Sequence, residues 1–583
     1  MNRPKLVFNE RALKSLIFIW IVSYCSILLT IQNALAQEDI LDFVPAETPY
    51  LMRYHADDRI TQLMELSVAD SISEKQIIQE YKPLIRMYAL LIRDLVIHVG
   101  TRSEAKLGLR PINQLQLGVY GLGIWPVITV SMSDSDRVKR WIATLAQKSG
   151  LTYESHDKII RFKVKVHPSI PGSFVLTFSG DKWAHFAYVP EVFSQEMIPY
   201  LTGDKAPKIS MSKAHTFNTW TQEAGVSPTS AIWIGIERIT QTLLGHGKGI
   251  NNRLRWFDDS LTQSISKDCV QELIEMSAQI PYVVSGERLH DSHNEYHSRV
   301  MFKFSDPLAK IFETLSSEGL YLTPTKNTFI NGAISLDMRA IFDVVQQLLN
   351  GRLQKPFKCD VLLKAGLTSQ QLQKVSAQLT LAPSFINDIN GMSFSVYDIE
   401  PNPKGIAIIS VNDLSNLINI FKSMNPNFSQ IQLPKIGEGP KKIQGLPTPS
   451  QVDLQVELQP NALGISVGEG MTQIVSQILK NPPSKNPPTL SVGYHLGRLT
   501  EAISNFLNKA KQAAHKIKEI KYQREVQLAK MKGLPPPLPP KDETDSSGSA
   551  LGMKIGAFQN SLRFTKQGLE LNITLKLHQI LKK

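Results

Sequence analysis

The chain repeats much of its own residue pattern, about 280 positions further along. Tracts from about residue 46 to about residue 250 return in the same order between about 327 and about 510. A repeat of this length indicates a duplicated domain, because each copy is long enough to bury a hydrophobic core of its own. The repeat therefore predicts two related lobes, at residues 37–326 and 327–583.

The clearest repeated unit is a strand pair that leads into a capped helix. In the first copy, residues 117–120 turn through glycine and proline into residues 127–132, and Asp134 then stands at an expected helix N-cap. The second copy has the same pattern from residue 394 onwards, with Asn412 or Asp413 as the cap. Strand pairs that alternate with helices predict an α+β fold, in which each lobe has a mainly antiparallel sheet with helices packed on one face.

Residues 1–36 have the pattern of a secretory signal peptide. Basic residues precede an uncharged apolar run at 15–31, and Ala34-Leu35-Ala36 supplies the small residues that a signal peptidase requires. We expect cleavage near Ala36 and a periplasmic or secreted mature protein. An uncleaved N-terminal membrane anchor at 15–31 is the alternative, because the apolar run is near the minimum length of a spanning helix.

Charge and cysteine content limit the partners. The chain carries a net charge of +12, and outside the cytosol such an excess favours anionic lipid or cell-wall polymer over nucleic acid. The alternative is a soluble surface that is basic without such a partner. Cys269 and Cys359 lie beyond the leader, and an oxidising compartment permits one disulfide between them. That bridge would close a loop of about 90 residues and contribute about 4 kcal/mol, whereas two buried thiols are the alternative.

An arginine stands at a strand-to-helix joint four times, as Arg59, Arg238, Arg339 and Arg498. A positive charge in the first turn of a helix opposes the helix dipole and costs a few tenths of a kcal/mol. We expect a carboxylate or carbonyl partner that offsets this cost and pins the joint. A ring of anion-binding arginines is the alternative.

The sequence contains no common catalytic motif: no His-Glu-x-x-His, Gly-x-Ser-x-Gly, P-loop or Cys-x-x-Cys. Its densest group of metal-ligating side chains is His290, His293 and His297. On a strand, His293 and His297 share one face, and zinc could use such a pair. The alternative is a polar loop. We therefore expect no cofactor and no catalysis, and a metal-dependent hydrolase built on these histidines is kept as the competing hypothesis.

The sequence predicts a long basic helix at residues 499–532, which begins at the Arg498 joint. Its candidate contacts to an anionic surface are Lys511, Lys516, Lys518, Lys521 and Arg524. The apolar stripe along this helix is thin, so we expect it to project from the body as a solvated arm or to lie on anionic lipid or wall polymer as a peripheral membrane contact. Residues 533–550 are first proline-rich and then polar, which predicts a disordered insert.

Residues 45–50 read Pro-Ala-Glu-Thr-Pro-Tyr. This segment resembles the Pro-Ala-acid-Thr-Pro-Tyr opening of certain large exported bacterial proteins of unknown function, and residues 203–213 resemble the same proteins. The resemblance implies a location in the bacterial envelope and no known activity, so it assigns no catalytic residue.

The sequence thus predicts an exported envelope protein that binds or scaffolds without catalysis through two homologous lobes. The expected partner is an envelope protein, anionic lipid or cell-wall polymer. A carrier of lipid or envelope polymer and the metal-dependent hydrolase are the alternative functions.

Overall fold

The computed structural model contains one continuous antiparallel sheet of nineteen strands within the part of the chain that it describes. The described residues are 39–55, 107–111, 114–163, 171–254, 265–288, 295–364, 367–379, 388–399, 402–424, 432–443, 453–495 and 555–577, with parts of helices between 83 and 95 and between 498 and 531. The predicted signal peptide, its alternative as an anchor and the proline-rich insert all lie outside these ranges.

The strands up to residue 303 form the first half of the sheet. They are β1 (Tyr50–His55), β2 (Gln116–Leu122), β3 (Trp125–Ser131), β4 (Tyr153–His156), β5 (Ile159–Lys163), β6 (Gly172–Ser179), β7 (Trp183–Pro190), β8 (Val226–Ile234), β9 (Tyr282–Arg288) and β10 (Glu295–Lys303). Antiparallel pairing places them in the order β4–β5–β6–β7–β3–β2–β1–β8–β9–β10.

The later strands form the second half. They are β11 (Ile330–Ile334), β12 (Ile389–Asp398), β13 (Lys404–Val411), β14 (Lys441–Lys442), β15 (Leu454–Gln459), β16 (Ala462–Val467), β17 (Leu490–Tyr494), β18 (Ile555–Thr565) and β19 (Gly568–Leu577). Their order is β19–β18–β17–β11–β12–β13–β16–β15–β14.

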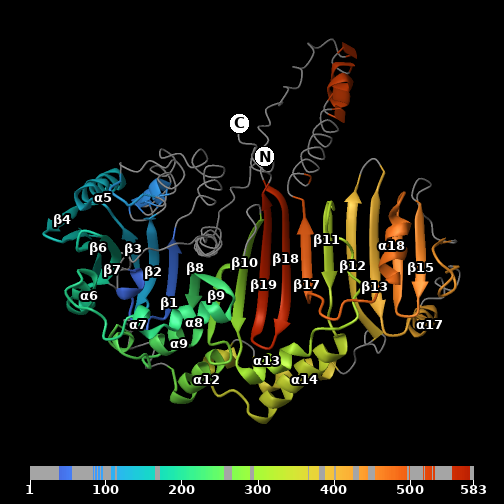
Figure 1. Cartoon of the computed structure of the whole chain (residues 1–583), viewed down its shortest axis with the longest axis horizontal. Helices are drawn as coiled ribbons and strands as arrows, with labels where there is room; N and C mark the ends of the chain where they lie inside the picture. Colours follow the sequence, from blue (N-terminus) through green and yellow to red (C-terminus); the bar gives the residue numbers. More distant parts are fainter. Residues whose placement is uncertain are drawn as a thin grey trace.

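The halves meet where β10 pairs with β19, along a register that runs from Glu295↔Lys576 to Lys303↔Gly568. Figure 1 shows these strands side by side at the centre of the molecule. The expectation of a separate sheet in each lobe is therefore wrong. A free β10 edge and a free β19 edge would each leave backbone donors and acceptors unpaired, and joining them removes both edges.

Helices surround this sheet. The longer ones are α5 (Ser135–Ser149), α6 (Ser194–Leu201), α8 (Thr216–Glu223), α9 (Ile236–Leu243), α12 (Lys267–Ser277), α13 (Asp306–Glu313), α14 (Met338–Gln354), α16 (Ser369–Leu379), α17 (Leu414–Met424) and α18 (Met471–Lys480). The short ones are η1 (Ile40–Asp42), η3 (Glu191–Phe193), α7 (Met211–Ala214), α10 (Ile250–Arg253) and α15 (Asp360–Lys364). Helix α5 confirms its predicted cap, because the Asp134 side chain accepts from the Arg137 amide.

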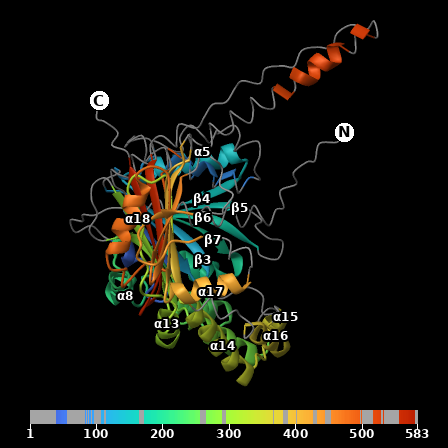
Figure 2. The same ribbon diagram turned by 90° about the vertical axis from the view of Figure 1, so that its right-hand side faces the viewer.

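The helices cover both faces of the sheet, so the expectation of one covered face is also wrong. On β13, Ile406 and Ile408 belong to the cluster of α18, whereas Ile409 and Val411 belong to the cluster of α17. Neighbouring strand residues point to opposite faces, and this strand is apolar on both, so both need cover. Figure 2 shows α17 and α18 on opposite sides of the strands.

The first half has the same arrangement. The Phe178 ring lies 5.1 Å from the Lys139 ammonium of α5, whereas the adjacent Thr177 hydroxyl donates to the Leu201 carbonyl at the end of α6, at 2.7 Å. We name the two sides of the sheet the α5/α17 face and the α6/α18 face, because the strand register carries each face across the whole sheet.

Two extended segments, which we call straps, cross the α6/α18 face. Strap one, residues 39–49, forms a bridge from Pro45 to Ser210, and strap two, residues 315–329, forms one from Leu320 to Ser484. Buried serines hold strap two: the Ser393 hydroxyl donates to the Tyr321 carbonyl at 2.6 Å, and the Ser410 hydroxyl accepts from the Tyr321 amide at 3.0 Å. These bonds satisfy backbone groups that the straps bury.

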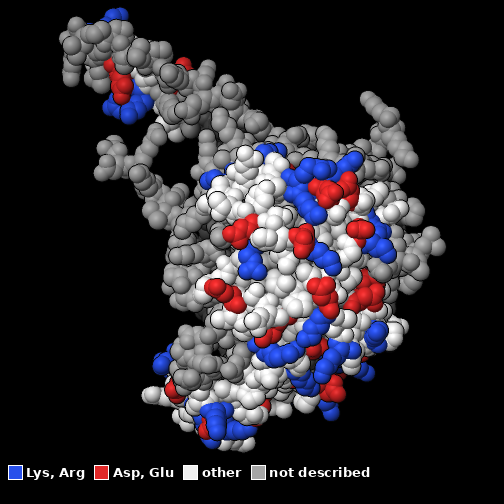
Figure 3. Space-filling view, turned by 90° about the vertical axis from the view of Figure 1, so that its left-hand side faces the viewer, with Lys and Arg blue, Asp and Glu red and all other residues white. Residues whose placement is uncertain are grey.

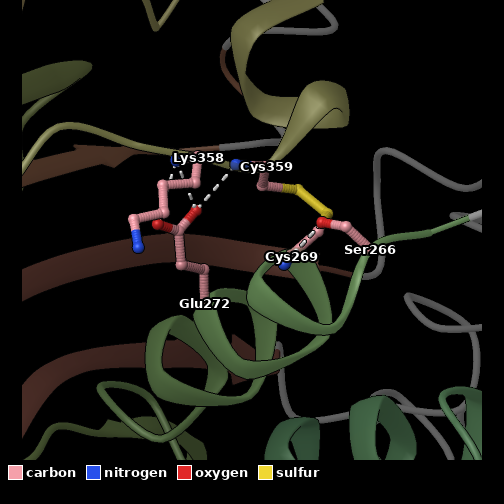
Figure 4. The surroundings of a disulfide bond; sticks show 5 residues. All are labelled: Ser266, Cys269, Glu272, Lys358 and Cys359. Atoms are coloured by element: carbon pink, nitrogen blue, oxygen red, sulfur yellow. Dashed lines mark hydrogen bonds between the residues drawn. A yellow bond between two sulfur atoms is a disulfide. The ribbon is translucent and has the colours of Figure 1, made fainter.

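A second connection between the halves lies below the sheet, where the structure joins Cys269 of α12 to Cys359 in a disulfide (Figure 4). The Glu272 carboxylate accepts from the backbone amides of Lys358 and Cys359, each at 3.0 Å. The Lys358 ammonium lies 3.5 Å from the Asp268 carboxylate. The first turns of α12 and the segment that leads into α15 (Figure 4) are thus held by a covalent bond and by charge-assisted contacts.

We expect the Cys269→Ser/Cys359→Ser variant to lose up to about 4 kcal/mol of unfolding free energy, because the bridge constrains a long loop of the unfolded chain. Urea unfolding of the variant, and of the wild type with and without reductant, measures this loss. Reduced wild type should match the variant, and equal midpoints for oxidised wild type and variant would contradict the prediction.

The buried His185 predicts a second effect on stability. His185 lies fully buried on β7, with Nδ1 2.8 Å from the Thr129 hydroxyl, and burial lowers its pKa from 6.5 to about 4. Between these values the unfolded chain binds a proton that the folded chain does not. The unfolding free energy should therefore fall as pH drops from about 6.5 to 4, by about 3 kcal/mol from this group.

His185→Gln, which retains a neutral hydrogen-bonding side chain, should remove that part of the pH dependence. Urea unfolding at pH values from neutral to 4 checks this, with His156→Gln on the exposed strand β4 as the matched control. A His185→Gln protein whose stability falls with pH as steeply as the control would show that His185 is not the titrating group.

Candidate functional site

The Arg238 joint lies at the start of α9, immediately after β8. Its Nη1 donates to the carbonyls of Ala46 at 2.7 Å and Thr48 at 3.1 Å. The guanidinium carbon also lies 5.0 Å from the ring centres of Trp220 and Trp233. Burial lowers the pKa of Arg238 and the Glu47 carboxylate opposes that shift. The two carbonyl contacts bind strap one, and the two rings hold the guanidinium from α8 and β8, so the joint has a structural role.

The Arg498 joint follows β17 in the second half. Its guanidinium donates to the Asn327 carbonyl of strap two at 3.3 Å and pairs with Asp398 at 2.9 Å. The backbone at both joints also makes the same contact, because the Gly235 amide donates to the Pro49 carbonyl at 2.8 Å and the His495 amide donates to the Phe329 carbonyl at 3.0 Å. Carbonyl and carboxylate partners thus surround these two arginines.

Of the other two joint arginines, the structure describes only Arg339. Arg339 is exposed in the first turn of α14, where the Asp337 side chain caps the helix by accepting from the Ala340 amide. Arg59 lies outside the described residues. The structure therefore brings no ring of four arginines together within the part of the chain that it describes.

The Pro-Ala-Glu-Thr-Pro-Tyr segment is the part of strap one that these contacts fix. The Thr48 hydroxyl donates to the Gly121 carbonyl at 2.8 Å, the Tyr50 hydroxyl donates to the Ile124 carbonyl at 3.0 Å, and the Glu47 carboxylate accepts from the Ile250 amide at 3.2 Å. The motif therefore attaches the strap to the β2–β3 turn and to α10. Its residue types are explained by these bonds.

The histidine cluster is only partly described. His290 and His293 lie outside the described residues. His297 lies on β10, with Nδ1 2.9 Å from the Thr574 hydroxyl and Nε2 3.3 Å from the Glu295 carboxylate. No group of three or more histidine, cysteine or carboxylate side chains with metal-binding geometry occurs among the described residues. The contacts of His297 are those of a structural residue across the β10–β19 junction.

The basic helix is described at residues 516–517, 519–527 and 530–531. It projects from the body as the red helix of Figures 1 and 2, and we call this part the arm. Lys516, Lys521 and Arg524 are exposed on it, whereas Lys511 and Lys518 lie outside the described side chains. None of the helices in the described ranges combines the length and apolar character that crossing a bilayer requires.

Charge elsewhere is mixed on the one face that Figure 3 displays. This view looks onto the β4 end of the sheet, and lysine and arginine are interspersed there with aspartate and glutamate. Opposite charges at short spacing cancel within about 10 Å at moderate salt. The end face shown thus offers no extended area of a single sign.

An exposed apolar area lies on the α5/α17 face of the second half. It consists of Ile334, Met392, Leu490 and Val492, which are between 38% and 44% exposed, and we call it the apolar strand patch. Ile334 on β11 pairs directly with Met392 on β12 and with Leu490 on β17. Contiguous exposed apolar side chains on a folded protein are typical of interaction sites.

Sequence reasoning missed this patch. Leu490 and Val492 alternate with Ser491 and Gly493, so the pattern did show that one face of β17 is apolar. It gave no sign that these side chains stay exposed in the folded chain. The missing information is the position of α14 and α16, which lie below the sheet (Figures 1 and 2).

We expect Arg238→Met to lower the unfolding free energy by about 3 kcal/mol, because two strap carbonyls lose their donor in a buried place. The exposed Arg339→Met should stay within about 0.5 kcal/mol of the wild type. Urea unfolding of both variants measures the difference between a buried and an exposed joint arginine. Equal losses would show that the carbonyl contacts of Arg238 contribute nothing.

The comparisons with known proteins add little. No protein-family model matches the chain, and no curated protein sequence is similar to it. Among solved structures, a crystal form of the protein TP0453 is similar, at 11% identity over 48% of this chain and 85% of that chain, with a TM-score of 0.22. A similarity of this size supports no conclusion on fold or function, and the resemblance of the Pro-Ala-Glu-Thr-Pro-Tyr segment stays a prediction.

Proposed function

We propose that this chain is a non-catalytic binding or scaffold protein of the cell envelope, in which two homologous halves share one sheet and the second half presents the apolar strand patch to an envelope protein. The observation that carries the proposal is the patch itself. Its side chains lie on neighbouring strands of a rigid sheet, and rigid apolar surfaces are favoured as binding sites because little ordering is needed when a partner docks.

Three features support homology of the halves. Counted outward from the β10–β19 junction, the strands of the two halves follow the same order. This order begins with β9 in one half and β18 in the other, and it reaches β5 and β14. Each half has a strap on the same face. Each also has an arginine joint whose strap carbonyl accepts from the backbone amide three residues before the arginine. An extracellular location is supported by the leader pattern and by the Cys269–Cys359 disulfide.

In the first half, the area that corresponds to the patch is covered from within the chain. Met52 and Tyr54 of β1, which share the α5/α17 face with Ile334 of β11, are buried. Met87, Leu90 and Leu91, from the helix between 83 and 95, are buried in one cluster with Tyr54. Asp94 of that helix accepts from the Trp141 indole of α5 at 2.9 Å.

The second half leaves the corresponding area open. The last α-helix that the structure describes between β11 and β12 is α16, as the helix between 83 and 95 is the last one that it describes between β1 and β2. Helix α16 packs on α14, where the Gln346 side-chain amide donates to the Ser376 hydroxyl at 2.8 Å. An amphipathic helix of a partner would fill the space that a helix of the first half fills from within the chain.

A photocrosslinking amino acid at Val492, introduced into the protein in its native envelope, tests the proposal. The expected result is a discrete crosslinked adduct at this position. The matched control position is Val192, a single exposed valine of the first half. Equal crosslinking at both positions, or none at Val492, would contradict a binding role for the patch.

Leu490→Glu/Ile334→Glu provides the complementary test. Both side chains are partly exposed, so the charges remain hydrated and the unfolding free energy should change by less than about 1 kcal/mol. The adduct formed at Val492 should disappear, because two carboxylates would be desolvated when an apolar partner docks. Adduct formation that persists in this variant would remove the patch from the proposed function.

A further inference from the structure

The arm carries an apolar stripe that the body of the protein does not use. Ile517, Ile520 and Met531 are 68%, 69% and 76% exposed. A solvated helix gains nothing from isoleucine and methionine in water, where each exposed apolar side chain forgoes its transfer free energy. A role of the arm as a solvent-exposed spacer therefore does not explain why these three residues are apolar.

Helix geometry places the stripe and the cations together. Residues at spacings of three, four and seven share one face, so Ile517, Ile520 and Arg524 line up, and Met531 continues the line. Lys516 and Lys521 lie at the two borders of the stripe. The acidic Glu519 and Glu525 lie away from it, at spacings that turn them toward the other side of the helix.

The two sides of the helix differ in exposure. Tyr522 and Val526 lie on the side opposite the stripe and are partly buried, whereas the stripe residues are open to solvent. The stripe thus faces outward on a helix that projects from the sheet (Figures 1 and 2).

We propose that the arm is an interfacial helix that lies along an anionic lipid bilayer, with Ile517, Ile520 and Met531 inserted between the headgroups. Lys516, Lys521 and the long side chain of Arg524 then reach the anionic headgroups, while their aliphatic stems stay in the apolar layer. An anionic polymer would use the cations alone and leave the isoleucines in water. The inference is independent of the apolar strand patch, because it concerns a different surface.

Vesicle co-sedimentation of the full chain tests the proposal. Wild type should bind vesicles of phosphatidylcholine and phosphatidylglycerol at least about tenfold more tightly than vesicles of phosphatidylcholine alone, and high salt should weaken this binding. Ile517→Ser/Ile520→Ser should lower the affinity by about tenfold or more, because it removes the inserted side chains. Val526→Ser, a matched loss of apolar surface on the opposite side, should leave the affinity unchanged.

A second measurement separates lipid from polymer. Lys516→Gln/Lys521→Gln/Arg524→Gln should lose the preference for anionic vesicles, and heparin, a soluble polyanion, should compete poorly with the vesicles for wild type. Circular dichroism confirms that each variant retains its fold. The proposal would be overturned if wild type did not bind the vesicles. It would also be overturned if wild type bound heparin as tightly as lipid and Ile517→Ser/Ile520→Ser had no effect. Neither result bears on crosslinking at Val492.

Discussion

The pairing of β10 with β19 is the contact on which the rest of the structure depends. It turns two sets of strands into one sheet and leaves only the short strands β4 and β14 at the outer edges. At its centre, the Arg299 guanidinium donates to the Asn572 side chain at 3.2 Å and lies 3.6 Å from the Glu570 carboxylate. A charged group placed between these partners stays hydrogen-bonded where the strands exclude water.

The straps complete what this pairing begins. Each crosses a buried face, where an irregular segment would otherwise leave its backbone groups unpaired. The contacts differ: Arg238 donates to two carbonyls of strap one, whereas serine hydroxyls bind the Tyr321 backbone of strap two. The same place in the fold is thus stabilised by different side chains, which explains why the two straps have dissimilar sequences.

The two proposed interaction surfaces both belong to the second half. The first half covers its α5/α17 face with a helix and continues from α9 into α12, which carries one cysteine of the disulfide. The second half leaves the apolar strand patch open and has the arm where the first half has α9 and α12. The first half is closed at these places, and the second half has the surfaces that we propose for partners.

The sequence by itself determined the local elements: the capped helix at Asp134, the paired strands around the turns and the arginines at the joints all follow from short-range patterns of capping and alternation. It did not determine that β10 and β19 join, because any two antiparallel edges satisfy the same residue pattern. The covered faces were misjudged for a different reason: β13 is apolar on both sides, and this pattern already indicated that both faces need cover. The open patch depends on where α14 and α16 lie, and only the tertiary structure decides the position of a helix relative to a distant strand.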